Sequence, residues 1–100
     1  MTEASKRKAI MDYLDEKVFN PALQYGKQEK NTTIVRGVNL TRARMSRLSS
    51  KQMVHYFWSA ISGTDKSIRF AEIMKECDIP RFETVFEEFR EKFNDDFFRN

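Results

Sequence analysis

The sequence predicts an all-α, compact single domain of about five helices. Along most of the chain, apolar residues recur at intervals of three and four, which is the spacing that one face of a helix requires. Hydrophobic residues make up 40% of the chain, with nine Phe, three Tyr and one Trp, whereas only three Gly and two Pro interrupt it. This composition argues against disorder. Because 100 residues is the size of one ordinary domain, we expect residues 1–100 to form a single α-helical domain.

The first predicted helix covers residues 3–19, where apolar side chains alternate with charged ones at helical spacing. Its apolar positions are Ile10, Met11, Leu14 and Val18. The pair Asn20-Pro21 interrupts the pattern, because a residue that precedes proline is disfavoured in the α conformation. We therefore expect the helix to break near Phe19 or Asn20, with a further turn starting at Pro21.

Residues 26–40 are expected to form a polar loop after the first helix. Gly26 and Gly37 lie near the two ends of this run, which holds only a short β-prone island at residues 32–35. An isolated strand would leave its backbone groups without partners, so we do not expect a sheet.

Two helices with a tight junction are predicted within residues 41–62. Thr41 is the expected N-cap of the first, and Ser49 with Gln52 forms a capping box at the start of the second. The apolar positions of the second helix have the spacing of a broad buried face, and they are Met53, Val54, Phe57, Trp58 and Ile61. We expect this second helix to be central to the core and to end at Gly63.

Two further helices are predicted in the C-terminal third, at residues 67–77 and 80–94. The first carries Cys77 on its apolar side and ends before Pro80. The second is strongly amphipathic, with a stripe of Phe82, Val85, Phe86, Phe89 and Phe93 opposite its glutamates.

Positive charge is concentrated in the middle of the chain. Residues 27–51 carry seven Lys or Arg and one acid, whereas residues 72–96 carry four Lys or Arg and nine acids. The candidate anion or nucleic-acid contacts are Arg36, Arg42, Arg44, Arg47 and Lys51, because such side chains neutralise phosphates and release counterions. In one continuous helix, Arg44, Arg47 and Lys51 would share a face. The alternative is that these cations are solvated, or that they pair with the glutamates of residues 83–91.

Phe97 and Phe98 form a second candidate site, an interface at the end of the chain. The two rings follow the last amphipathic stripe, in the sequence NDDFFRN. They either fold back on the core of the domain or dock into a partner.

Groups with catalytic or ligand-binding chemistry are few. One cysteine, Cys77, and one histidine, His55, cannot form an internal disulfide or a closed Cys/His zinc site. His55 and Ser59 stand four residues apart, but no nucleophile elbow or glycine-rich loop accompanies them. We therefore expect no enzyme activity, no cofactor and no metal.

Together, these features predict a non-enzymatic helical interaction or regulatory module that binds a protein partner or itself. The alternative is a small nucleic-acid-associated protein that uses the basic segment 36–51 on phosphates. No apolar run approaches the roughly 20 residues of a membrane span, and acids occupy the place of a signal-peptide core. We therefore expect a soluble, cytoplasmic protein without membrane contact.

Overall fold

The computed structural model describes residues 1–62 and 82–99, and every regular element within these ranges is helical. This confirms the all-α prediction for the described part of the chain. The predicted 67–77 helix, with Cys77, lies outside the described residues, as does the expected helix end at Gly63.

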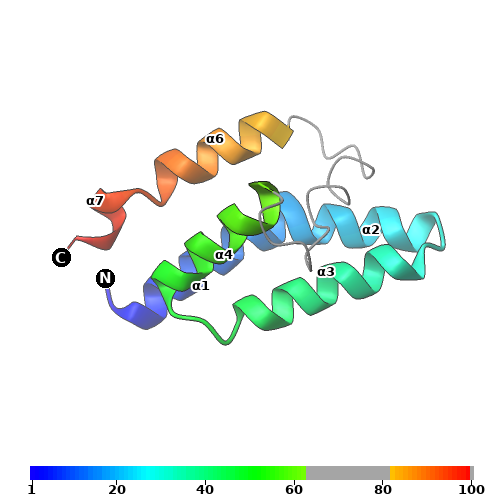
Figure 1. Ribbon diagram of the computed structural model, residues 1–100, viewed down its shortest axis with the longest axis horizontal. Coiled ribbons are helices and arrows are strands. Elements are labelled where there is room, and N and C mark those ends of the chain that lie inside the picture. The colour runs from blue at the N-terminus through cyan, green and yellow to red at the C-terminus, as the bar shows by residue number, and fades with distance from the viewer. Residues whose placement is uncertain (63–81, 100) are drawn as a thin grey trace.

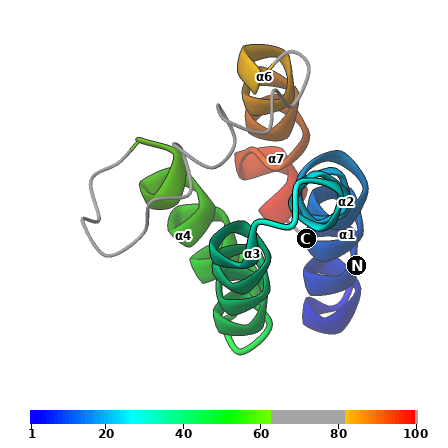
Figure 2. The same ribbon diagram turned by 90° about the vertical axis from the view of Figure 1, so that its right-hand side faces the viewer.

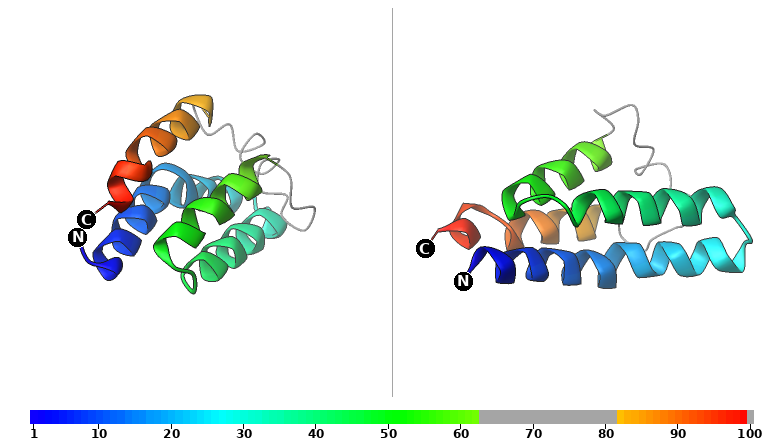
Figure 3. Two further views of the ribbon diagram at one scale, coloured as in Figure 1. Left: turned by 60° about the vertical axis from the view of Figure 1, so that its left-hand side comes forward. Right: turned by 90° about the horizontal axis from the view of Figure 1, so that it is seen from below.

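The first 28 residues include one long helical rod, which continues where a break was predicted (Figure 1, Figure 3). It consists of α1 (Glu3–Leu14), η1 (Asp15–Phe19) and α2 (Asn20–Gln28). The η1 segment is a π turn, in which the backbone N–H of Asn20 donates to the carbonyl of Asp15, five residues back. The predicted break near Phe19 or Asn20 is therefore wrong. A widened turn directly before Pro21 accommodates the missing N–H of the proline without ending the helix.

The predicted polar loop at residues 26–40 is also wrong, because most of it is helical. α2 runs to Gln28, and α3 (Thr32–Met45) begins after a turn of only a few residues. Asn31 caps α3, since its side chain accepts a hydrogen bond from the backbone N–H of Ile34 at 3.1 Å. One face of α3 is buried against the rod through Ile34, Val38, Thr41 and Met45. This packing outweighs the low helix propensity of the β-branched residues 32–35.

Thr41 has a different role from the predicted N-cap. It lies inside α3, where its buried hydroxyl donates to the carbonyl of Gly37, four residues back, at 2.8 Å.

The capping box at the start of α4 (Ser50–Ser62) is confirmed. The backbone N–H of Ser49 donates to Gln52 Oε1 at 3.1 Å, and the N–H of Gln52 donates to Ser49 Oγ at 3.3 Å. Glu3 of α1 also binds here, because its carboxylate accepts from the backbone N–H of Ser50 at 2.8 Å. The negative carboxylate therefore lies at the positive end of the α4 dipole.

The C-terminal part confirms the amphipathic helix predicted at residues 80–94. It consists of α6 (Phe82–Lys92) followed by the short helix α7 (Asp95–Phe98). Phe93 and Asn94 separate them, and Asn94 caps α7, since Asn94 Oδ1 accepts from the N–H of Phe97 at 3.2 Å. The two ends of the chain meet on one side of the molecule (Figure 1), where Lys6 Nζ lies 3.5 Å from the carbonyl oxygen of Phe98.

Seen along the rod, α1–α2, α3, α4 and α6 surround a common interior (Figure 2). Its centre is aromatic, with Phe57 and Phe89 at a ring-centroid distance of 4.7 Å and Tyr13 at 5.6 Å from Phe93. Each fully buried ring contributes roughly 1.5–3 kcal/mol by leaving water. Burial, together with the negative charge of Glu88, raises the pKa of Tyr13 to about 12. The phenol therefore stays neutral and donates to the carbonyl of Val85 at 3.2 Å.

Candidate functional site

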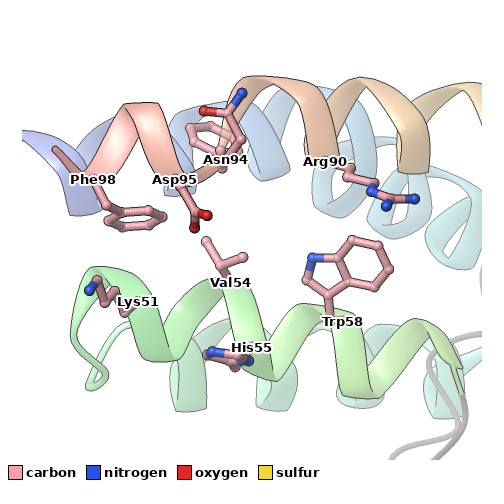
Figure 4. Close-up of a pocket in the computed structure, with 9 residues that line it drawn as sticks. Lys51, Val54, His55, Trp58, Arg90, Asn94, Asp95 and Phe98 are labelled. Atoms are coloured by element: carbon pink, nitrogen blue, oxygen red, sulfur yellow. The ribbon is translucent and has the colours of Figure 1, made fainter.

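A groove lies between α4 on one side and α6 with α7 on the other (Figure 4). Its volume is about 400 Å³, within the range typical of sites for small molecules and peptide side chains. Among the described residues it is lined by Lys51, Val54, His55, Trp58, Arg90, Phe93, Asn94, Asp95 and Phe98. We call this site the aromatic groove.

The apolar part of the groove is an extension of the core. Phe93 is only 4% exposed and connects the groove to the buried aromatic cluster. Val54 and Trp58, one turn apart on α4, are half-buried and point towards α6 and α7 (Figure 4). The Trp58 ring packs edge-on against Phe86 at a centroid distance of 4.5 Å. One side of Trp58 is therefore fixed by packing while another lines the groove.

A cation lies beside an aromatic ring at each end of the groove. The guanidinium carbon of Arg90 is 5.9 Å from the centroid of the Trp58 ring. Lys51 Nζ is 6.0 Å from the centroid of the Phe98 ring. At these distances the rings attract the cations and restrict them to the groove's edges.

Polar groups between these ends complete the lining. Asp95 is the one carboxylate among the described lining residues, and its side chain points towards α4 (Figure 4). His55 lies on the exposed side of α4 and adds a nitrogen base. Two permanent cations, Lys51 and Arg90, stand against the one carboxylate of Asp95, so the groove attracts negative groups.

The five predicted anion contacts do not form one cluster in the structure. Arg42 is occupied by an ion pair, because its Nε and Nη2 donate to the two carboxylate oxygens of Asp15 at 2.7 and 2.8 Å. The hydrogen bond to Asp15 raises the pKa of Arg42. One alternative for these cations was pairing with the glutamates of residues 83–91, but Arg42 pairs with Asp15 instead.

Arg44, Arg47 and Lys51 do not share a helical face, because α3 ends at Met45 and the chain turns before α4 begins. Arg44 is exposed on α3, and Arg47 is exposed in the turn that follows it. Lys51 belongs to the aromatic groove. Arg36 is exposed near the start of α3 and lines a separate hollow beside the α2–α3 turn.

Phe97 and Phe98 pack partly against the core of their own chain. The Phe97 ring stands edge-on to Phe93 at 4.9 Å and to Phe98 at 5.0 Å. Phe97 anchors the last turn to the core, whereas Phe98 lines one end of the aromatic groove.

The sequence interpretation missed the groove because its two walls come from distant segments. Trp58 was assigned to the core, and no local pattern placed Arg90 or Asp95 beside it. The available signal was local: Val54 and Trp58 stand at i and i+4, on the edge of the apolar stripe of α4.

Two arrangements that would indicate a catalytic site are absent from the described residues. Within residues 1–62 and 82–99, no group of three or more His, Cys, Asp or Glu side chains is placed to hold a metal ion. In the same ranges His55 makes no hydrogen bond to a carboxylate that would orient it as a base.

Comparison with known protein families, with curated proteins and with solved structures found no significant match. None of the helices in the described part of the chain is both long and apolar enough to cross a membrane.

Proposed function

We propose that this chain is a non-enzymatic helical interaction module that binds a partner protein through the aromatic groove. The observation that supports this proposal most directly is the pairing of Arg90 with Trp58 and of Lys51 with Phe98 at the two ends of an apolar floor. Tryptophan and arginine are the residue types most enriched where binding energy concentrates in protein interfaces.

The chemistry of the groove defines its partner. Val54 and Trp58 accept an apolar side chain, and Lys51 and Arg90 attract carboxylates on either side of it. A volume of about 400 Å³ holds a few side chains rather than the face of a whole domain. The occupant is therefore a short segment of another protein that carries an apolar residue flanked by acids.

Selection from a library of random dodecapeptides displayed on phage, with the wild-type protein as bait, tests the proposal. We expect the enriched peptides to combine acidic residues with a large apolar one. Each enriched peptide is then measured by calorimetry. Its affinity should fall at least about tenfold, or about 1.4 kcal/mol, for Arg90→Glu and for Trp58→Ala.

Leu40→Ser is the matched control, because Leu40 is an exposed apolar residue on α3, away from the residues that line the groove. It should leave the affinity unchanged. Circular dichroism must show that each variant is folded. Failure to enrich any peptide, or equal binding to all three variants, would contradict the proposal. A dimer in light scattering that dissociates in Arg90→Glu would instead identify a second copy of the chain as the occupant.

A further inference from the structure

A second surface, on α3, is also positively charged but, unlike the aromatic groove, has no aromatic lining. From Lys30 to Ser62 the sequence contains six Lys or Arg residues and no acid. Two of these cations do not belong to the α3 surface: Arg42 forms an ion pair with Asp15, and Lys51 lines the aromatic groove. The remaining arginines, Arg36, Arg44 and Arg47, are exposed and make no ion pair within the described residues.

These arginines follow the outer side of α3. Arg36, Leu40 and Arg44 stand four residues apart, so they lie on neighbouring turns of the same exposed face. Arg47 follows in the turn after the helix. At about 1.5 Å per residue, the 14-residue helix α3 is about 21 Å long (Figure 3).

Further cations extend this face at the N-terminal end of α3. A hollow of about 320 Å³ beside the α2–α3 turn is lined by Lys27, Lys30 and Arg36 together with uncharged residues. One acid, Glu29, lies in the same turn and is exposed. Five cations therefore follow one side of α3 with a single acid near one end. We call Lys27, Lys30, Arg36, Arg44 and Arg47 the basic ridge.

The composition of the ridge favours a nucleic acid over a protein as its partner. The centres of protein interfaces are rich in aromatic residues, and where arginine occurs there it accompanies them. Here the exposed face of α3 has one large apolar side chain, Leu40, which is 52% exposed, and arginines on the turns before and after it. Arginine binds phosphate oxygens with paired donors. A duplex carries one charge per about 1.7 Å of axis, so α3 spans several phosphates when it lies along the duplex.

We propose that the basic ridge binds the phosphate backbone of nucleic acid without reading its sequence. This surface shares no residue with the aromatic groove, so the inference is independent of the proposed protein partner.

Fluorescence anisotropy with a labelled duplex DNA of mixed sequence, at 50 and 200 mM NaCl, tests this inference. Contact with three to five phosphates predicts that Kd rises about 40- to 500-fold between these salt concentrations. Arg36→Gln/Arg44→Gln/Arg47→Gln should weaken binding at 50 mM by at least about tenfold and reduce the salt dependence. Scrambling the sequence of the duplex should leave Kd unchanged.

The matched control is Lys8→Gln/Lys92→Gln/Arg99→Gln, which removes the same number of exposed cations from other elements. It should change Kd less than about threefold. Trp58→Ala, which alters the groove, should bind DNA with the same Kd as the wild type. A failure of the DNA-binding inference can therefore be distinguished from a failure of the groove proposal. Equal weakening by both triple variants, or no binding at 50 mM, would overturn the inference. Tighter binding of polyglutamate than of DNA, lost in the ridge variant, would reassign the ridge to an acidic protein.

Discussion

Two long-range side-chain contacts connect α1 to the start of α4. Glu3 accepts hydrogen bonds from both the backbone N–H and the hydroxyl of Ser50, while Arg7 Nη2 donates to the carbonyl oxygen of Ser46. These contacts fix the turn between α3 and α4 on the surface of α1. The rod therefore positions the helix that supplies one wall of the groove.

The Glu3 contact makes stability depend on pH in the acid range. The hydrogen bonds from Ser50 lower the pKa of Glu3 below its ordinary value of 4.5. A carboxylate with a lowered pKa in the folded state stabilises the protein above pH 4.5, and this stabilisation is lost as pH falls through the lowered value. Urea unfolding from pH 6 to pH 3 should show a smaller decline for Glu3→Gln than for the wild type. Glu87→Gln is the control and should follow the wild type. If the free energy of unfolding fell equally with pH in the wild type and both variants, the prediction would be contradicted.

Gly26 of α2 lies directly against α3. A Cβ atom at this position would lie 2.9 Å from Val35 Cγ2 and 3.0 Å from Ile34 Cγ2. Both methyl groups belong to β-branched residues, whose rotamers are restricted in a helix. Glycine is therefore required here by space.

We expect Gly26→Ala to lower the free energy of unfolding by about 1–2 kcal/mol. Overpacking costs about 1–3 kcal/mol, and the better helix propensity of alanine returns up to about 1 kcal/mol. Urea denaturation measures the effect. The penalty should shrink in a Val35→Ala background, because the closest methyl group is then absent. An equal penalty in both backgrounds would show that the crowding is not its cause.

The helix α4 has two apolar sides with different functions. Phe57 is fully buried against Phe89, whereas Trp58 is half-buried and lines the groove. The core does not require the whole Trp58 ring, which leaves part of it available for binding.

This division predicts unequal costs of truncation. Phe57→Ala should lower the free energy of unfolding by about 3–5 kcal/mol, because it opens a cavity in the core. Trp58→Ala should cost at least about 1 kcal/mol less, since part of its ring already faces solvent. Guanidinium denaturation of the two variants checks the order. A larger loss for Trp58→Ala would place the tryptophan, not Phe57, at the centre of the core.

Local signals predicted several elements correctly. Ser49 and Gln52 predicted the start of α4, and the spacing of Val85, Phe89 and Phe93 predicted α6. Both signals are local, because a capping box and an amphipathic stripe are formed by residues close together in the sequence. The helix over residues 32–35 was not predictable in this way. It depends on packing against the rod, which no short window of sequence contains.

For the candidate sites too, local patterns were predictable from the sequence and contacts between distant residues were not. The clustering of arginines was visible in the sequence, but the ion pair between Arg42 and Asp15 was not, since 27 positions separate the two residues. The groove required the fold, because Trp58 and Arg90 meet only when α6 lies beside α4.

At the scale of the whole molecule, positive and negative charges are concentrated in different segments. α3 and α4 contain no acid, while residues 82–99 carry six acids and three cations. The aromatic groove lies where these two regions meet, with Lys51 on the first and Asp95 on the second. Because the basic ridge and the groove are made of different residues, the proposed partners could bind together.

The C-terminal helix α7 packs its two phenylalanine rings partly against the core and should therefore stabilise the fold. Ending the chain at Asn94 removes the partly buried rings of Phe97 and Phe98, so we expect a loss of about 2–3 kcal/mol in unfolding free energy. Urea denaturation measures this loss. Ending the chain at Phe98 keeps both rings. It removes the exposed pair of Arg99 with Asp96 and the hydrogen bonds from the Arg99 N–H to the carbonyls of Asp95 and Asp96, and should cost less than about 1 kcal/mol. Equal effects of the two truncations would contradict an anchoring role for the rings.

The π turn has a consequence for how the rod keeps its buried side. Ile10, Leu14, Val18, Ala22 and Gly26 are all buried, although they are spaced by four throughout. In an uninterrupted α-helix each such step rotates by about 40° beyond a full turn, so the stripe would drift away from the interior. The π turn contains one extra residue, which rotates all the following residues back by about 100° around the helix axis. This rotation returns Ala22 and Gly26 to the side that faces the interior. The length of the segment Asp15–Phe19 is thus constrained more strongly than its composition, since losing one residue would turn Gly26 away from α3.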